Sequence, residues 1–150
     1  MSQRYLCFSL GKEQFALPLL DIREVMGVPQ IAPVPFAPSH YKGITNLRGQ
    51  VISVIDLRPK LGIEPLNGPE TSVVICDMKS SLLGLVVDSV NMVASPEDSE
   101  ISLPPATESG TAKIISGVYR KENELIMILQ VDSLLDSVDK DLISKAQAAA

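Results

Sequence analysis

Short apolar runs alternate with polar turns along most of the chain, and this pattern predicts β-strands rather than long helices. The runs come in pairs separated by a few polar residues, as antiparallel hairpins require. Such pairs are expected at 5–10 with 15–19, within 41–62, at 73–77 with 83–87, and at 114–119 with 125–131. The sequence therefore predicts a mainly β protein.

The central stretch, 41–62, is the most distinctive of these pairs, and it reads YKGITNLRGQVISVIDLRPKLG. Its second strand, 51–57, is apolar on both faces, because Ile55 lies on one side and Val54 on the other. A strand with two apolar faces belongs in the interior of a protein. The rest of the chain is expected to be arranged around this hairpin.

The turn between the two central strands is polar and contains Asn46, Arg48 and Gly49. Gly49 can adopt the positive φ angles of tight hairpin turns, and Asn46 is expected to bond the turn backbone. Asp56 lies at the end of the second strand, at a position typical of a helix cap. We therefore predict structural turn roles for Asn46, Gly49 and Asp56, whereas Arg48 places a long cation beside a buried sheet.

Three segments show a helical rather than a strand pattern. Asp21 is expected to cap a short helical turn at 21–26 that ends at Gly27, and 88–93 repeats the same arrangement. A C-terminal helix is expected at about 134–148, docked on the body of the protein through one apolar face. That face is formed by Leu134, Leu135, Val138, Leu142 and Ile143.

The second half of the chain repeats the plan of the first, which indicates two similar β subdomains built from one degenerate repeat. The strongest break lies at 65–69, so subdomain 1 is expected at about 1–66 and subdomain 2 at about 71–135. With about five short strands each, both are predicted to be small closed or partly closed barrels that pack together. Chance similarity between pairs of hairpins is the alternative, and the sequence leaves open which barrel the first strand, 5–10, completes.

Composition narrows the classes of function. The chain has 150 residues, of which 45% are hydrophobic, a formal net charge of -5 and no dense run of Lys and Arg. A nucleic-acid-binding barrel needs a basic face with exposed aromatic side chains, so nucleic acid is not an expected partner. No apolar run approaches the roughly 18 residues of a membrane span, and a cytoplasmic protein without direct membrane insertion is expected. Cys7 and Cys76 lie in apolar runs, which favours buried, reduced thiols.

An enzyme is the main rival class, but its catalytic residues are not apparent in the sequence. His40 is the only histidine, and it lies in a proline-rich loop where a solvated imidazole is expected. Asp21, Asp56, Asp88 and Asp132 each follow a strand, which favours helix caps over a paired-carboxylate site. Phosphate-binding glycine loops, CxxC and HExxH motifs are absent from the sequence. We therefore expect no catalytic residues, no cofactor and no bound metal.

The central stretch resembles the signature of the CheW family of bacterial chemotaxis coupling proteins, in which a Gly-aliphatic-x-Asn-Leu-Arg-Gly turn precedes an aliphatic-rich Val-Ile-Asp-Leu-Arg. The resemblance covers nearly the whole chain, because three other segments are similar to the family's first, third and last hairpins. These segments read YLCFSLGKEQFALPLLDIREVM, LLGLVVDSVNMV and GVYRKENELIMILQVDSLL. The chain is thus identified as a single CheW-like domain spanning 1–150, without a receiver or kinase domain.

The resemblance implies two SH3-like β-barrels and a signalling scaffold, or adaptor, without catalytic activity. Family members link the cytoplasmic tips of chemoreceptors, the methyl-accepting chemotaxis proteins, to the regulatory domain of the histidine kinase CheA. The receptor tip, a helical hairpin, lies in the groove between the barrels, at family positions that correspond to Ile22, Gly43, Arg48 and Val93. The CheW-like domain of CheA pairs with the second barrel through apolar side chains that remain unassigned here. A scaffold of a non-chemotaxis pathway, for example pilus-based motility, is the alternative.

The chemistry of three of these positions fits receptor binding, and each also has a structural reading. Ile22 and Val93 would supply an apolar patch from corresponding places in the two half-repeats, or they are ordinary core residues. Gly43 would let a receptor helix approach the backbone closely, or it serves backbone geometry alone.

Arg48 also has two readings. Its planar guanidinium suits a receptor carboxylate or backbone carbonyl. Next to a turn, however, the same side chain fits an ion pair with a surface acid such as Asp56 or Glu24, and such a pair contributes about 0–1 kcal/mol when exposed. The residues alone favour the ion pair, whereas the family resemblance favours receptor binding.

Overall fold

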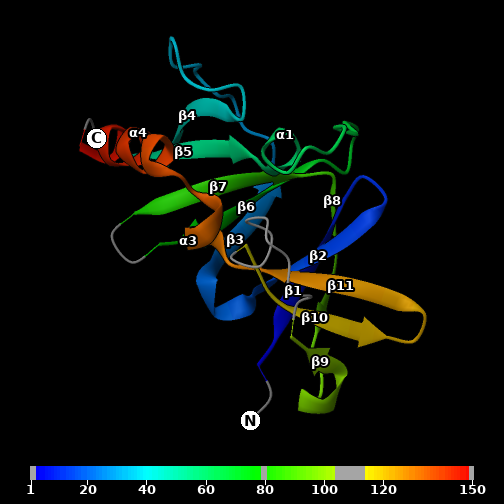
Figure 1. Cartoon of the computed structure of the whole chain (residues 1–150). Helices are drawn as coiled ribbons and strands as arrows, with labels where there is room; N and C mark the ends of the chain where they lie inside the picture. The colour runs from blue at the N-terminus through cyan, green and yellow to red at the C-terminus, as the bar shows by residue number, and fades with distance from the viewer. Residues whose placement is uncertain (1–2, 79–80, 104–113, 149–150) are drawn as a thin grey trace.

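The computed structural model describes residues 3–78, 81–103 and 114–148, which form two β-sheets and several short helices (Figure 1). The five-stranded sheet contains, in order across the sheet, β3 (Ile22–Gly27), β6 (Ser72–Asp77), β7 (Leu82–Val87), β5 (Gln50–Asp56) and β4 (Tyr41–Leu47). The six-stranded sheet contains β8 (Ser89–Ala94), β1 (Tyr5–Leu10), β2 (Glu13–Pro18), β11 (Glu124–Leu129), β10 (Ile115–Lys121) and β9 (Ile101–Ser102). The predicted mainly β architecture is confirmed.

The helices are short and follow strands. They are η1 (Leu19–Asp21), α1 (Leu57–Lys60), η2 (Asp98–Glu100), α3 (Val131–Leu134) and α4 (Ser137–Ala148). The expected C-terminal helix is present as α4, which packs along β5, but Leu134 belongs to the separate α3 and Val138 is exposed. Among the described residues, no helix has the length and apolar character needed to cross a membrane.

The two sheets exchange hairpins between the halves of the chain. The first hairpin, β1–β2, lies in the six-stranded sheet between β8 and β11, whereas β6–β7 lies between β3 and β5. Parallel pairing of β2 with β11 and of β7 with β5 joins the halves. The expected boundaries at 66 and 71 therefore do not separate the sheets, because each sheet takes strands from both sides of that break. The first strand, which the sequence left unassigned, belongs to the six-stranded sheet.

The strand register supports the predicted repeat in its first three strands. β1 pairs with β2 in the same register as β6 with β7, so Tyr5 corresponds to Val73. The pairing of β3 with β6 skips Arg23, and the pairing of β8 with β1 skips Asn91. The two bulges fall at the same place in the repeat, and residues 22–26 therefore correspond to residues 90–94.

The last two strands of each half also correspond. The amide N–H of Asp56 donates to the carbonyl of His40 at 2.7 Å, and that of Gln130 donates to the carbonyl of Ile114 at 2.7 Å. Both hydrogen bonds close a hairpin at the point where a short helix begins, after β5 and after β11. Asp56 therefore corresponds to Gln130, and the residues that follow them, up to Arg58 and Asp132, correspond as well.

The short helical turns expected at 21–26 and 88–93 are wrong, because both segments are edge strands, β3 and β8. Extended pairing with the neighbouring strand decides the conformation, and in β3 the half-buried residues are Ile22, Glu24 and Met26. A carboxylate on the half-buried face obscured this alternation in the sequence.

The main core lies between the two sheets. Its fully buried members include Phe8, Leu10 and Leu17 from the six-stranded sheet, and Ile55, Leu57, Leu83 and Leu85 from or next to the five-stranded sheet. The opposite face of β5 contributes Ile52 and Val54 to a second cluster, so both apolar faces predicted for this strand are buried. Each such large aliphatic side chain contributes roughly 1.5–3 kcal/mol when fully buried. The packing of one sheet on the other is thus the main source of stability.

Both cysteines are buried free thiols, as predicted. Burial, followed by the nearby charge of Asp21, raises the pKa of Cys76 to about 12. This thiol therefore stays protonated at neutral pH, which disfavours oxidation and metal binding.

Candidate partner-binding site

The turn between β4 and β5 has left-handed backbone at both of its central residues. The φ angle is 51° at Arg48 and 84° at Gly49, and the side-chain oxygen of Asn46 accepts a hydrogen bond of 2.9 Å from the amide of Gly49. Positive φ at both positions matches the right-handed twist of the strands. The turn therefore fixes the base of the Arg48 side chain.

The guanidinium of Arg48 pairs directly with Glu24 in β3, the strand at the other edge of the five-stranded sheet, so the two edges of this sheet lie close together. Two nitrogens donate to the two carboxylate oxygens at 2.5 and 3.1 Å, and these hydrogen bonds lower the pKa of Glu24. Of the two surface acids proposed from the sequence, Glu24 is thus the partner of Arg48, and Asp56 is not. In the described ranges β3 and β4 share no backbone pairing, so this ion pair is a side-chain link between the two edges.

Gly43 is a close-packed position in β4. Its φ is 140°, and a Cβ atom there would lie 2.0 Å from the carbonyl oxygen of Ala32. Two backbone hydrogen bonds, of 2.8 and 2.9 Å, join Ala32 to Ile44. The segment that approaches the Gly43 backbone is therefore part of the same chain, and the absence of a side chain serves this internal packing.

Ile22 and Val93 do not occupy corresponding places in the repeat, contrary to the expectation from sequence. The register equates Val93 with Val25 and Ile22 with Val90. Val93 is 50% exposed on β8 and Val25 is 41% exposed on β3, whereas Ile22 packs partly against the main core. Val25 was missed because 21–26 was interpreted as a helix, and strand alternation is the signal that would have found it.

The structure thus brings only some of the four predicted residues together. Ile22 lies in β3, the same strand as the Glu24 that pairs with Arg48, while Gly43 packs against the neighbouring segment at the other edge of the same sheet. Val93 lies in the six-stranded sheet. The exposed features of the candidate site are therefore a positioned guanidinium and one valine on each of two edge strands.

A buried ion network lies where β5 ends. Asp56 caps α1 through a 3.0 Å hydrogen bond from the amide of Arg58, and it also accepts from the guanidinium at 2.8 and 3.0 Å. Arg58 donates in addition to Asp88 at 3.1 Å, and Asp88 accepts from the amide of Gly11 at 2.6 Å. These hydrogen bonds raise the pKa of Arg58, with Asp56 as the largest cause. The network ties α1 to the turn between β1 and β2 and to the connection between β7 and β8, which is a structural role.

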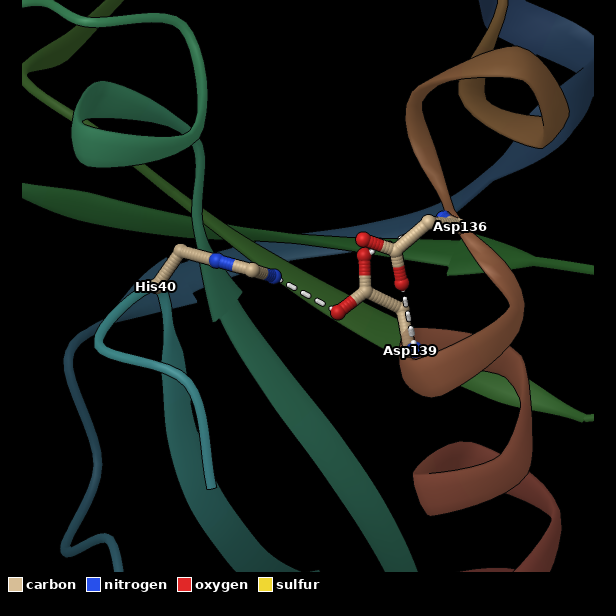
Figure 2. A group of neighbouring side chains, drawn as sticks. All are labelled: His40, Asp136 and Asp139. Atoms are coloured by element: carbon tan, nitrogen blue, oxygen red, sulfur yellow. Dashed lines mark hydrogen bonds and ion pairs between the residues drawn. The ribbon is translucent and has the colours of Figure 1, made fainter. Parts of the chain in front are cut away.

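His40, Asp136 and Asp139 lie close together beside the first turn of α4, and their candidate ligand atoms are within 4.8 Å of one another (Figure 2). His40 Nε2 lies 2.6 Å from Asp139 Oδ1, so His40 is not the solvated imidazole expected from sequence. The ammonium of Lys60 lies 2.7 Å from Asp139 and 3.3 Å from Asp136. Because this ammonium already offsets part of the charge of the two carboxylates, the group fits a side-chain latch that holds α4 on the body better than a metal centre.

Comparisons with known proteins agree with one another. The family model for the CheW-like domain matches residues 4–139. "Chemotaxis protein CheW" of Rhizobium meliloti (strain 1021) is 28% identical over 138 residues, which cover 91% of this chain and 89% of that protein. "Protein FrzA" of Myxococcus xanthus is 27% identical over 146 residues, which cover 95% and 91% of the two chains. The crystal structure of scaffolding protein TtCheW from Thermoanaerobacter tengcongensis is similar with a TM-score of 0.83 and 29% identity, covering 91% of this chain and 89% of that one.

Proposed function

Because this chain belongs to the CheW-like domain family, we propose that it is a chemotaxis coupling protein that links chemoreceptor tips to the regulatory domain of the histidine kinase CheA. The observation that carries the proposal is the family match over residues 4–139, which includes strands of both sheets. Coupling requires two separate binding surfaces and no chemical reaction. We place the protein in the cytoplasm, held at receptor arrays through its partners.

The receptor tip is proposed to bind at the edge strand β3, with Arg48 as its polar anchor. Glu24 uses two of the five N–H donors of the guanidinium, and the Arg48 side chain is 73% exposed. A receptor carboxylate or carbonyl would therefore meet a guanidinium whose orientation is already fixed, which lowers the entropic cost of binding. Ile22 and Val93 supply apolar contacts, and Gly43 acts by admitting the segment that supports this face.

The kinase is proposed to bind elsewhere, through apolar side chains of the second subdomain. The exposed Leu125 at the start of β11 shows that apolar surface is available there. Two modest interfaces on separate parts of one small protein suit a bridge, because clustering in an array multiplies weak contacts. No catalytic residue is assigned.

The proposal is tested by a pull-down with a receptor-tip fragment and the CheA regulatory domain from the same genome, separately and together. Arg48→Asp is expected to weaken receptor binding by about tenfold or more, because repulsion replaces a charge-assisted hydrogen bond. Kinase binding and melting temperature are expected to stay nearly unchanged. Arg120→Asp, the same charge change in the equivalent hairpin of the other half, is the control and should retain receptor binding.

Two outcomes decide against parts of this proposal. Normal receptor binding by Arg48→Asp, together with a large fall in melting temperature, assigns Arg48 to structure alone. Binding of the unmodified protein to neither partner removes the coupling role.

The similarity to FrzA supports one alternative, a CheW-like scaffold of a non-chemotaxis chemosensory pathway such as pilus-based motility. The two readings differ in the behaviour that depends on the gene. A deletion that abolishes directed swimming favours the chemotaxis role, and one that abolishes only surface motility favours the alternative.

A further inference from the structure

A cleft of about 500 Å³ opens where β11 ends, and the candidate receptor residues do not line it. Its floor includes Tyr5 of β1, Ile128 of β11 and Val131 of α3. Carboxylates line it from three elements, with Asp21 before β3, Asp77 at the end of β6 and Asp132 in α3. The cleft thus combines apolar surface from the six-stranded sheet and α3 with acidic groups from η1, β6 and α3.

The repeat provides a direct counterpart of this cleft at the end of β5, and there it is filled. Gln130 and Asp132 correspond to Asp56 and Arg58, and the buried guanidinium of Arg58 occupies the equivalent space. The chain after α1 covers this guanidinium, because Leu66 accepts from Arg58 at 3.5 Å and donates its amide to a carboxylate of the network. In this half, an arginine and an apolar segment close the site.

At the cleft, the arginine is replaced by an aspartate, and among the described residues the chain that follows α3 does not fold back over the site. The chain after α3 continues into α4, which packs along β5 instead of folding back. Asp77 is paired with Arg23 at 2.9 Å. Within the part of the chain that the structure describes, Asp21 and Asp132 have neither a hydrogen-bond nor an ion-pair partner. The cleft therefore presents two unpaired carboxylates beside apolar surface.

We propose that this cleft binds an arginine flanked by apolar residues in a segment of a protein partner. The partner would thereby supply the guanidinium and the apolar cover that Arg58 and Leu66 of this chain supply at the end of β5. Two unpaired carboxylates lining one cleft would attract a guanidinium, and the net charge of -5 favours a basic segment. Apolar neighbours of the arginine would cover Ile128 and Val131. The proposal is independent of the coupling role.

The test uses the whole protein and two capped peptides, acetyl-Ala-Leu-Arg-Leu-Ala-amide and the same peptide with citrulline in place of arginine. Citrulline keeps the shape of arginine without its charge. Titration followed by amide NMR is expected to shift Met78, Ser116 and Asp132, with the citrulline peptide about tenfold or more weaker. Asp21→Asn combined with Asp132→Asn is expected to reduce affinity for the arginine peptide by a similar factor.

Asp132→Arg gives a second, independent readout, because it places an arginine where the counterpart has Arg58. It is expected to abolish peptide binding, whereas Asp141→Arg on α4, with the same change of charge, should leave binding intact. Equal affinity for the two peptides, shifts that fall outside the cleft, or undiminished binding by both cleft variants would each overturn the proposal.

Discussion

The segment that follows β5 and the segment that follows β11 are equivalent in the repeat, and they start with the same structure but continue differently. At the end of β5 and at the end of β11, the same backbone hydrogen bond closes a hairpin and a short helix follows. After β5, Arg58 joins two aspartates in a network that excludes solvent. After β11, the equivalent helix carries Asp132, and a cleft remains.

This difference shows that one set of sequence features decides how the strands pair, and another decides whether the space after the last strand of each half is covered. Alternation of apolar residues, which both halves share, favours strands and sets the register within each hairpin. Closure depends on a few polar residues and on where the following segment goes. The chain after α1 covers its own half, whereas α4 crosses to the other half and is held there by Lys60 and His40.

The largest effect is expected for Arg58→Ala, which tests whether the buried network after β5 depends on the positive charge of Arg58. Removal of the guanidinium leaves Asp56 and Asp88 buried without their partner, and breaking a buried pair in this way costs about 3–5 kcal/mol. Urea denaturation monitored by circular dichroism measures the change in the free energy of unfolding. Arg120→Ala, on the exposed face of β10, is the control and is expected to change it by less than about 0.5 kcal/mol. Equal effects of the two substitutions would mean that closure does not depend on Arg58.

Two glycines at the same position of the repeat give the next comparison. Gly43 and Gly117 are both the third residue of equivalent strands, yet only Gly43 has a positive φ. Gly43→Ala is expected to destabilise by about 2–4 kcal/mol, because the new Cβ atom meets the Ala32 carbonyl and the backbone is strained. At Gly117 the nearest atom is Ile101 Cγ2 at 3.2 Å, a side-chain atom that can shift.

Gly117→Ala is therefore expected to cost about 1 kcal/mol or less. Thermal melts of the two variants under identical conditions provide the measurement. A loss for Gly117→Ala as large as that for Gly43→Ala would show that the two halves pack equally tightly against these strands.

Much of the fold follows from local pattern in the sequence. The central hairpin, the two-faced strand 51–57 and the repeat could be predicted because alternation and turn chemistry act over a few residues. The exchange of hairpins could not, since an apolar strand such as β1 fits either sheet equally well by its own pattern. Its position is decided by parallel pairing of β2 with β11, a contact between distant parts of the chain.

The candidate site was harder to predict, because its polar residues depend on partners far away in sequence. His40 was expected to be solvated, yet its partner Asp139 is 99 residues away. Glu24 obscured the strand pattern of β3, because a half-buried carboxylate is expected only where a partner such as Arg48 neutralises it. Buried polar groups require hydrogen-bond partners, and a single sequence does not show which residues supply them.

The smallest predicted effect concerns the latch, the group of His40, Lys60, Asp136 and Asp139 that holds α4 against the first half of the chain. A hydrogen bond from the amide of Asp139, followed by the bond from Lys60, lowers the pKa of Asp136 from its ordinary 3.8. Because the folded chain then binds this proton less tightly than the unfolded chain, Asp136 contributes stability that is fully present above about pH 4 and lost as the pH falls further. Asp136→Asn keeps a good helix cap and removes only the charge.

This variant is expected to be slightly less stable than the unmodified protein at pH 7, and the difference is expected to shrink as the pH falls below about 4 towards 3, as measured by urea midpoints across that range. Asp141→Asn removes an equally exposed charge from an ion pair with Lys145 within α4 and controls for general acid effects. A stability difference for Asp136→Asn that stays constant from pH 7 to pH 3 would assign the contribution of this residue to capping. The crossing of α4 would then depend on the buried Asp139, which accepts from both Lys60 and His40.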